Sequence, residues 1–341
     1  MPETENTHQG NPIIIQQDHG NAIAQENIDN MQPGNPIIIQ QDHGNAIAPE
    51  NIDNMQPGNL NTRTYSDDEI NNPAVIDVTI ADTKTPIVVL FGPPQSGKTM
   101  TMIRLAEYLT HPDRGYTVAP DRAFRKAFDE TYRINCDNFN GMLNSIWAAE
   151  KSKGLEFMQL VVSKDGRPIV QILEAPGEHY YDPVDPNEPK VGFLPYITKV
   201  IQSPNRKIWV YLTEPNWKDQ GDRMKYAQKV HLMKRSISRR DKSIILFNKV
   251  DATNLFYSTG EVNHKEAERF VDSQYPGLFR CFKNENPITS LWRKYNCTLI
   301  PFVTGSYNKV LVDGKNTQRY VAGPDRYPRV LWDSILKIVK G

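Results

Sequence analysis

The segment GPPQSGKT, at positions 92–99, has the residue types and the spacing to bind a phosphate group. Glycines at 92 and 97 let the backbone turn so that its N–H groups converge on phosphate oxygens. Lys98 can reach the terminal phosphates of a nucleotide, and the hydroxyl of Thr99 can bind Mg²⁺. This is the P-loop or Walker A pattern, G-x-x-x-x-G-K-[ST]. The residues that we expect to contact the nucleotide here are Gly92, Gln95, Ser96, Gly97, Lys98, Thr99 and Met100.

The flanking segments are those that a phosphate-binding loop requires. The apolar run PIVVLF, 86–91, is typical of a buried parallel strand, and the motif leads into TMIRLAEYLT, 100–109, as a helix. The N-terminal dipole of that helix would favour the negative charge of the phosphates. Pro93 and Pro94 depart from glycine-rich versions of the loop, because they remove two N–H groups and stiffen the backbone.

A second motif, NKVD at 248–251, ends another apolar run and could select the base. The carboxylate of Asp251 can accept two hydrogen bonds from the N1–H and N2–H₂ groups of guanine, whereas adenine has no such pair of donors. Asn248 would brace the loop, and Lys249 would lie along the base plane and back toward the P-loop. Its place after the P-loop, at the fifth core strand, favours this reading over an ordinary polar strand end. It also disfavours the alternative of a P-loop ATPase or kinase.

The apolar pattern alternates between strand and helix over the rest of the body. Strands are expected over 74–82, 155–174 (a hairpin), 207–214, 243–251 and 297–303, and helices near 137–154, 190–202, 218–238, 262–275 and 327–339. The hairpin turns at Asp165-Gly166, a strong signal for such a turn. The predicted fold class is therefore α/β over residues 73–341: a doubly wound, mostly parallel sheet with one antiparallel hairpin.

The order of these motifs resembles the translation-factor-related class of P-loop GTPases, with a Ras-like core, over roughly residues 83–341. EAPG, 174–177, resembles the Asp-x-x-Gly motif of that class, and TGSY, 304–307, is a partial match to its last guanine loop. The resemblance implies that Glu174 holds Mg²⁺ through water and that the N–H of Gly177 contacts the γ-phosphate. It also implies guanine contacts by Gly305 and Ser306. The run Pro-Gly-Glu at 176–178 is similar to one in bacterial double-GTPase families.

The same resemblance implies where catalysis and switching would occur. Glu178 stands where many such GTPases carry a Gln that orients the attacking water, and Lys98 would act with it on the phosphates. The threonine that covers Mg²⁺ is expected between residues 110 and 155, with Thr117 as the first candidate metal ligand and Thr131 as the second. Segments near 111–135 and 174–188 would change with the γ-phosphate.

These motifs predict a GTP-binding protein that hydrolyses GTP to GDP with Mg²⁺ as a regulatory switch. The alternative is a scaffold that holds GTP or GDP without turnover, because Glu174 and Glu178 depart from the usual residues at these two positions. Either protein would meet a partner through its switch segments or its tail.

The N-terminal tail is a different kind of polymer from the body. The chain has 40 basic and 40 acidic residues, yet residues 1–62 contain no Lys or Arg and eight acids. Residues 10–33 recur as 34–57 with one change, Gln25 to Pro49. Two polar repeats are too few for a solenoid core, so we expect a disordered acidic tail over 1–72. The Ile runs at 13–15 and 37–39 could anchor a partner, although a duplicated tail without that role is the simpler interpretation.

Composition excludes several other classes. A net charge of zero argues against a general nucleic-acid or membrane-coating protein. The cysteines, Cys136, Cys281 and Cys297, lack metal-site or disulfide spacing and indicate a reducing compartment. The absence of a signal-peptide pattern or a long apolar run makes a cytoplasmic protein the expectation. Residues 218–242 hold nine Lys or Arg against three acids, which suits an acidic partner, a membrane surface, the chain's own acidic tail or a solvated helix end.

Overall fold

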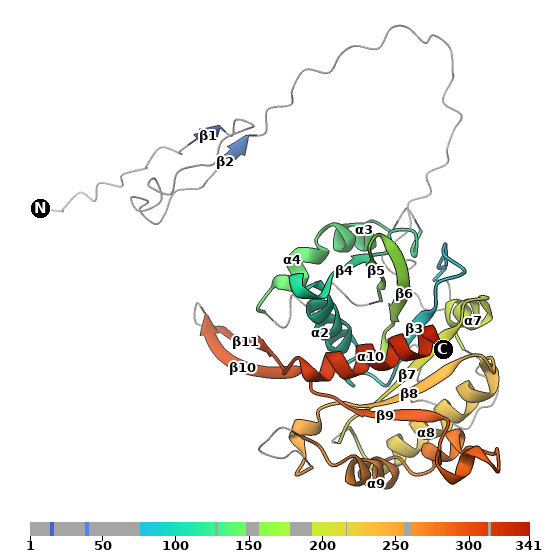
Figure 1. The fold of residues 1–341 in the computed structure, drawn as a ribbon. Helices are drawn as coiled ribbons and strands as arrows, with labels where there is room; N and C mark the ends of the chain where they lie inside the picture. Colours follow the sequence, from blue (N-terminus) through green and yellow to red (C-terminus); the bar gives the residue numbers. More distant parts are fainter. Residues whose placement is uncertain are drawn as a thin grey trace, which may run out of the picture. The chain divides into compact units, whose positions relative to one another are not determined.

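The computed structural model describes residues 76–126, 129–147, 157–177, 193–215, 217–255, 261–312 and 315–341, and the backbone of two short strands in the repeats (Figure 1). The chain divides into two units, 1–62 and 63–341. In the first unit, β1 (Ile14–Gln16) and β2 (Ile38–Gln40) pair in parallel. The rest of the tail, for which we expect disorder, lies outside the described residues.

A seven-stranded sheet forms the centre of the second unit, in the order β4-β5-β6-β3-β7-β8-β9. The strands are β3 (Ile87–Phe91), β4 (Tyr116–Pro120), β5 (Gln159–Lys164), β6 (Arg167–Glu174), β7 (Lys207–Thr213), β8 (Lys242–Phe247) and β9 (Cys297–Pro301). Only β5 runs against the others, because it pairs antiparallel with both β4 and β6. The predicted fold class is confirmed: the sheet is mostly parallel and carries one antiparallel hairpin.

The central strands are mostly apolar because helices pack around the sheet and cover both of its faces. Every residue of β3 and of β7 is buried. The helices of this layer are α2 (Lys98–Thr110), α7 (Pro195–Gln202), α8 (Gln220–Ser236), α9 (His264–Gln274) and α10 (Arg326–Lys340). Helices α2 and α10 lie side by side (Figure 1). None of the described helices is both long and apolar enough to cross a membrane.

The β5–β6 hairpin turns where the sequence predicts it. Asp165 has φ 50° and Gly166 has φ 73°. Two successive positive φ angles are the requirement of a tight two-residue turn whose twist matches that of its strands, and Asp-Gly meets it at low steric cost. The turn places β6 beside β3, so that the end of β6 comes to the P-loop.

The segment before β3 is not the strand that alternation over 74–82 predicts. Among residues 76–82, Val78 forms only an isolated bridge, to Arg125. Ile76 and Val78 are nevertheless buried, and the residues between and after them are not. The alternation therefore reflects a segment that packs every second side chain against the core without joining the sheet.

Other elements of the structure have no counterpart in the sequence prediction. These are the edge strand β4, helix α3 (Glu130–Asp137), and a second hairpin of β10 (Gly305–Val312) and β11 (Lys315–Ala322) between β9 and α10. The helix expected in 137–154 begins as α4 (Phe139–Asn144), and residues 148–156 lie outside the described part. Both hairpin strands are mostly exposed, which explains why neither shows the apolar alternation of a half-buried strand.

Candidate functional site

The P-loop lies between the end of β3 and the start of α2, as the sequence predicts. The Nζ atom of Lys98 donates to the carbonyl oxygens of Gly92, at 3.1 Å, and Pro93, at 3.0 Å, and the side chain is buried. Gly97 has φ 86°, and a Cβ atom there would overlap Nδ2 of Asn248. The Lys98 side chain thus bonds back to carbonyl groups of its own loop, and Asn248 of the NKVD motif packs directly against the P-loop.

Thr99 and Glu174 meet at the candidate metal position. The Thr99 hydroxyl donates to Oε1 of Glu174 at 3.1 Å, and the backbone N–H of Phe157 donates to Oε2 at 2.8 Å. Glu174 ends β6, in register with Leu90 of β3, and only 2% of its surface is exposed. Oxygen atoms of these two types are the protein ligands that Mg²⁺ accepts, and the bond from Phe157 fixes the carboxylate's orientation. The longer Glu side chain therefore still reaches Thr99, and the pair fits Mg²⁺.

Gly177 also lies against the P-loop. A Cβ atom at this position would overlap backbone atoms of Pro93 and Pro94. Glycine is required because any side chain would push the two segments apart. The EAPG motif therefore approaches the P-loop at both of its ends, through Glu174 and through Gly177.

Asn248 connects the predicted base loop to the phosphate loop. Its Nδ2 atom donates to the carbonyl oxygen of Ser96 at 3.0 Å, and its Oδ1 accepts from the N–H of Lys249 at 2.9 Å. The backbone N–H of Asn248 donates to the carbonyl of Thr213, at the end of β7. The side chain is fully buried. One residue thus joins the ends of two neighbouring strands to the P-loop.

Lys249 reaches back to the P-loop, as predicted, and has a partner that the sequence analysis missed. Its Nζ atom donates to the carbonyl of Gln95, at 3.3 Å, and forms an ion pair with Glu214. The Tyr275 hydroxyl accepts from the N–H of Glu214 and donates to its carbonyl oxygen. Burial raises the pKa of Tyr275, so the hydroxyl keeps the proton that it donates. An acidic residue just past β7, the strand beside β3, was the available signal for Glu214.

The rest of the base loop extends toward β9. Asp251 is exposed in the short 3₁₀ turn Val250–Ala252, and the N–H of Val250 donates to the carbonyl of Phe302, at 3.3 Å. The predicted last guanine loop runs directly into β10, in which Ser306 pairs with Val321. Gly305 there has φ 153°. The carboxylate that would select guanine is therefore on the surface, next to the strand end that leads to TGSY.

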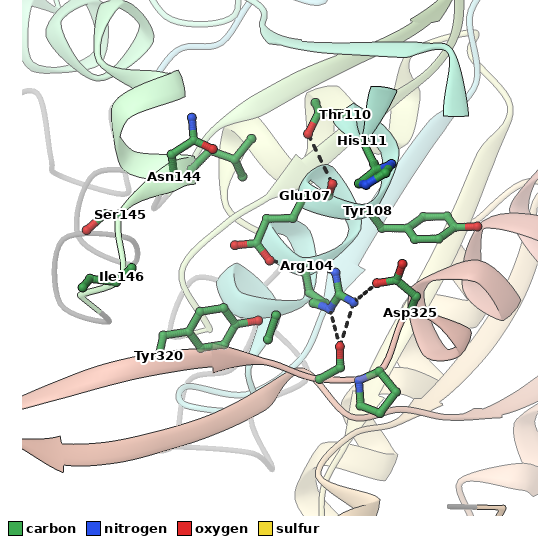
Figure 2. A pocket seen from close by; sticks show the side chains of 14 residues that line it. Arg104, Glu107, Tyr108, Thr110, His111, Asn144, Ser145, Ile146, Tyr320 and Asp325 are labelled. Atoms are coloured by element: carbon green, nitrogen blue, oxygen red, sulfur yellow. Dashed lines mark hydrogen bonds and ion pairs between the residues drawn. The ribbon is translucent and has the colours of Figure 1, made fainter. Parts of the chain in front are cut away.

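Arg104 of α2 connects the phosphate-binding helix to the hairpin and α10 (Figure 2). Its guanidinium donates twice to the carbonyl of Gly323, at 3.2 and 2.7 Å, and pairs with Asp325. The N–H of Gly323 donates to the carbonyl of Thr304, at 3.0 Å. The last loop is therefore linked to α2 through Gly323. A cavity of about 730 Å³ opens beside Arg104, lined also by Tyr108, Asn144 and Tyr320.

Thr117, the first candidate for the third metal ligand, is not brought to this site. It lies in the edge strand β4 opposite Ser163 of β5, which in turn pairs with Pro168 near the start of β6. Glu174 is at the other end of β6, about 20 Å away along the strand at 3.3 Å per residue. The expectation for Thr117 was wrong because residues 116–120 form β4, a strand at the edge of the sheet. Thr131 is exposed on α3.

Glu178 lies outside the described residues, as do residues 179–192. Its assignment as the catalytic residue therefore stays a prediction.

Comparisons with known proteins give structural likeness only. No family model matches the sequence, and the search of curated proteins found no match. The structure is similar to Roco2 RocCORdC of Methanosarcina barkeri bound to GDP, with 11% identity, 77% of this chain and 52% of that chain covered, and a TM-score of 0.30. It is also similar to a chain of the signal recognition particle receptor SRb-GTP/SRX complex of Chaetomium thermophilum, with 12% identity, 73% of this chain and 98% of that chain covered, and a TM-score of 0.35.

A third likeness is to the Ski7 GTPase-like domain of S. cerevisiae bound to GDP and inorganic phosphate, with 13% identity, 65% and 43% of the two chains covered, and a TM-score of 0.35. This chain spans about half the length of the Roco2 chain and less than half that of the Ski7 chain. The class follows from this chain's own strand order and motif contacts: the second unit has the fold of a P-loop GTPase domain.

Proposed function

We propose that this protein binds GTP and hydrolyses it to GDP with Mg²⁺, as a regulatory switch. The observation that carries the proposal is the bond from Asn248 to the carbonyl of Ser96. It fastens the loop that bears Asp251 to the phosphate-binding loop, so that one nucleotide can contact both. Because the carboxylate of Asp251 offers two acceptor oxygens, a base loop joined to the P-loop in this way suits guanine, whose N1–H and N2–H₂ are paired donors.

The residues that would bind the phosphates and Mg²⁺ already lie close together in the structure. Thr99 and Glu174 would hold Mg²⁺, which neutralises negative charge on the phosphate oxygens when it is bound. Lys98 would exchange the carbonyl oxygens of Gly92 and Pro93 for phosphate oxygens. Residues 95–99 keep their N–H groups as possible donors to the phosphates, because only Pro93 and Pro94 lack one. The N–H of Ser96 donates to the Pro93 carbonyl, at 3.3 Å, and would exchange that bond for one to a phosphate oxygen.

Turnover and switching rest on the segment after β6. Glu178 would orient or deprotonate the attacking water, and Gly177 would contact the γ-phosphate through its N–H. The change between nucleotide states would then fall on residues 174–188, a polar, proline-rich and aromatic stretch that suits recognition of a partner protein. In the other expected switch segment, 111–135, five residues form β4 and pair with β5, so the change there would involve the residues beyond that strand.

The test is calorimetry on the full chain with GTP, GDP and ATP in the presence of Mg²⁺, together with phosphate release. We expect guanine-selective binding that is abolished by Lys98→Ala and shifted to xanthine nucleotides by Asp251→Asn. Asp333→Asn, an exposed aspartate on α10, is the matched control and should bind as the wild type does. A preference for ATP, or no binding, would contradict the proposal. Binding without phosphate release would favour the alternative function, a scaffold that holds GTP or GDP without turnover.

A further inference from the structure

The two repeats of the tail pair with each other, and the pairing is in register. Ile14 lies opposite Ile38, Ile15 opposite Ile39, and Gln16 opposite Gln40, in parallel. Partners are 24 positions apart, which is the period of the repeat, so each row of the sheet joins a residue to its own copy.

Nothing in the geometry of a parallel, in-register pair of identical strands restricts the sheet to two strands. Each strand presents to its open side the same backbone groups that its partner uses, so a third strand of this sequence could add without a change of geometry. Two strands of three residues are also only marginally stable by themselves in water, because independent stability normally requires three or more strands. Extension would therefore stabilise the pair.

The local sequence favours such extension. Residues 13–17, IIIQQ, are uncharged, and β-branched Ile is followed by Gln, which can form ladders of side-chain amides along a stack of strands. Pro12 precedes this stretch and Asp18 follows it, and both recur in the second repeat. Proline and a charge are the residues that confine strand addition to a short segment. Each repeat thus carries one bounded, self-complementary strand.

We propose that the repeats of separate copies of this chain pair in the same way, so that each copy contributes two strands to a shared parallel sheet. The occupant of the open edges is a second copy of the chain, because only an identical repeat reproduces the rows of identical residues that β1 and β2 form. In the shared sheet, β2 of one copy meets β1 of the next, so positions 14 and 38 alternate along the stack. This assembly is independent of the proposed nucleotide chemistry.

The alternation allows a test with matched variants of the full chain. Ile14→Lys with Ile38→Lys, and Ile14→Glu with Ile38→Glu, place like charges next to each other along the row that positions 14 and 38 form, whereas Ile14→Lys with Ile38→Glu makes the charges in that row alternate in sign. Like charges directly opposite each other destabilise strand pairing, and opposite charges support it. Analytical ultracentrifugation over a concentration series should show high-mass species for the wild type and for the Lys/Glu variant. The like-charge variants should need about tenfold higher concentration, or remain monomeric.

Two results would overturn the proposal. One is a wild-type chain that stays monomeric over the whole series, which would leave the Ile runs as anchors for a different protein. The other is equal assembly of the Lys/Lys and Lys/Glu variants, because in-register rows must distinguish them. GTP binding by all variants, measured by calorimetry, should equal that of the wild type. A failure of assembly is thereby separated from a failure of the nucleotide proposal.

Discussion

Asn248→Ala should weaken the binding of every nucleotide without changing the preference among bases. The side chain is fully buried and makes two hydrogen bonds, to the carbonyl of Ser96 at 3.0 Å and from the N–H of Lys249 at 2.9 Å. Neither bond is made to a nucleotide. The residue's contribution to binding is therefore to hold the base loop and the phosphate loop at a fixed separation.

The expected magnitude follows from the two groups that the substitution leaves behind. Ser96 is fully buried, so its carbonyl oxygen loses its partner and stays out of water, which costs about 1–3 kcal/mol. Lys249 is partly exposed, so water can replace the bond to its N–H at little net cost. We expect the free energy of unfolding of the nucleotide-free chain to fall by about 1–3 kcal/mol, and the GTP affinity to fall by about tenfold or more.

Denaturant unfolding of the nucleotide-free chain measures the first quantity, and calorimetry with GTP, GDP and XTP measures the second. Asp251→Asn is the matched control, because it alters a group that would contact the base and leaves the connection between the loops intact. The two variants should thus give opposite patterns: a uniform loss for Asn248→Ala and a change of base preference for Asp251→Asn. A uniform loss in the control, or a change of base preference in Asn248→Ala, would refute the reasoning.

Three further substitutions test other parts of the site. Glu178→Ala should slow phosphate release about 100-fold or more at unchanged GTP affinity, and unchanged release would remove Glu178 from the mechanism. Glu174→Ala should raise the Mg²⁺ concentration needed for tight GTP binding, which calorimetry at a series of Mg²⁺ concentrations measures. An unchanged Mg²⁺ requirement would exclude Glu174 from the metal site. Arg104→Met should lower the unfolding free energy by about 1–3 kcal/mol, because a buried, charged guanidinium loses its two hydrogen bonds to the Gly323 carbonyl. Arg133→Met, at an exposed position on α3, is its control and should leave thermal unfolding unchanged.

The meeting of the two motifs was predictable because both stand at the carboxyl ends of parallel strands. Such ends lie along one edge of a sheet, so a loop after β3 and a loop after β8 must come near each other when only β7 separates them. The sequence could not show which atoms join them. The bond from Asn248 to Ser96 spans 152 positions and depends on Gly97, which has no Cβ atom and so leaves room for the amide.

The failure with Thr117 has a different physical origin. A switch threonine was expected between α2 and the hairpin, and Thr117 lay in a part of that interval for which no strand was predicted. Five residues of the interval instead form an edge strand, which needs to bury only one of them, Val118. An edge strand with so little apolar pattern resembles a loop in the sequence. The same argument applies to the exposed hairpin β10–β11, whose rows carry few buried side chains.

The contacts around the P-loop indicate which part of the domain would move. The base loop is joined to it by hydrogen bonds from Asn248 and Lys249. Gly177, by contrast, meets the prolines at 93 and 94 through close packing, and proline has no N–H with which to hold it. A γ-phosphate that bonds the N–H of Gly177 would therefore act where close packing, and not an N–H of Pro93 or Pro94, joins the two segments. Under the proposed function, a nucleotide-dependent change would begin at Gly177, while the base loop keeps its place.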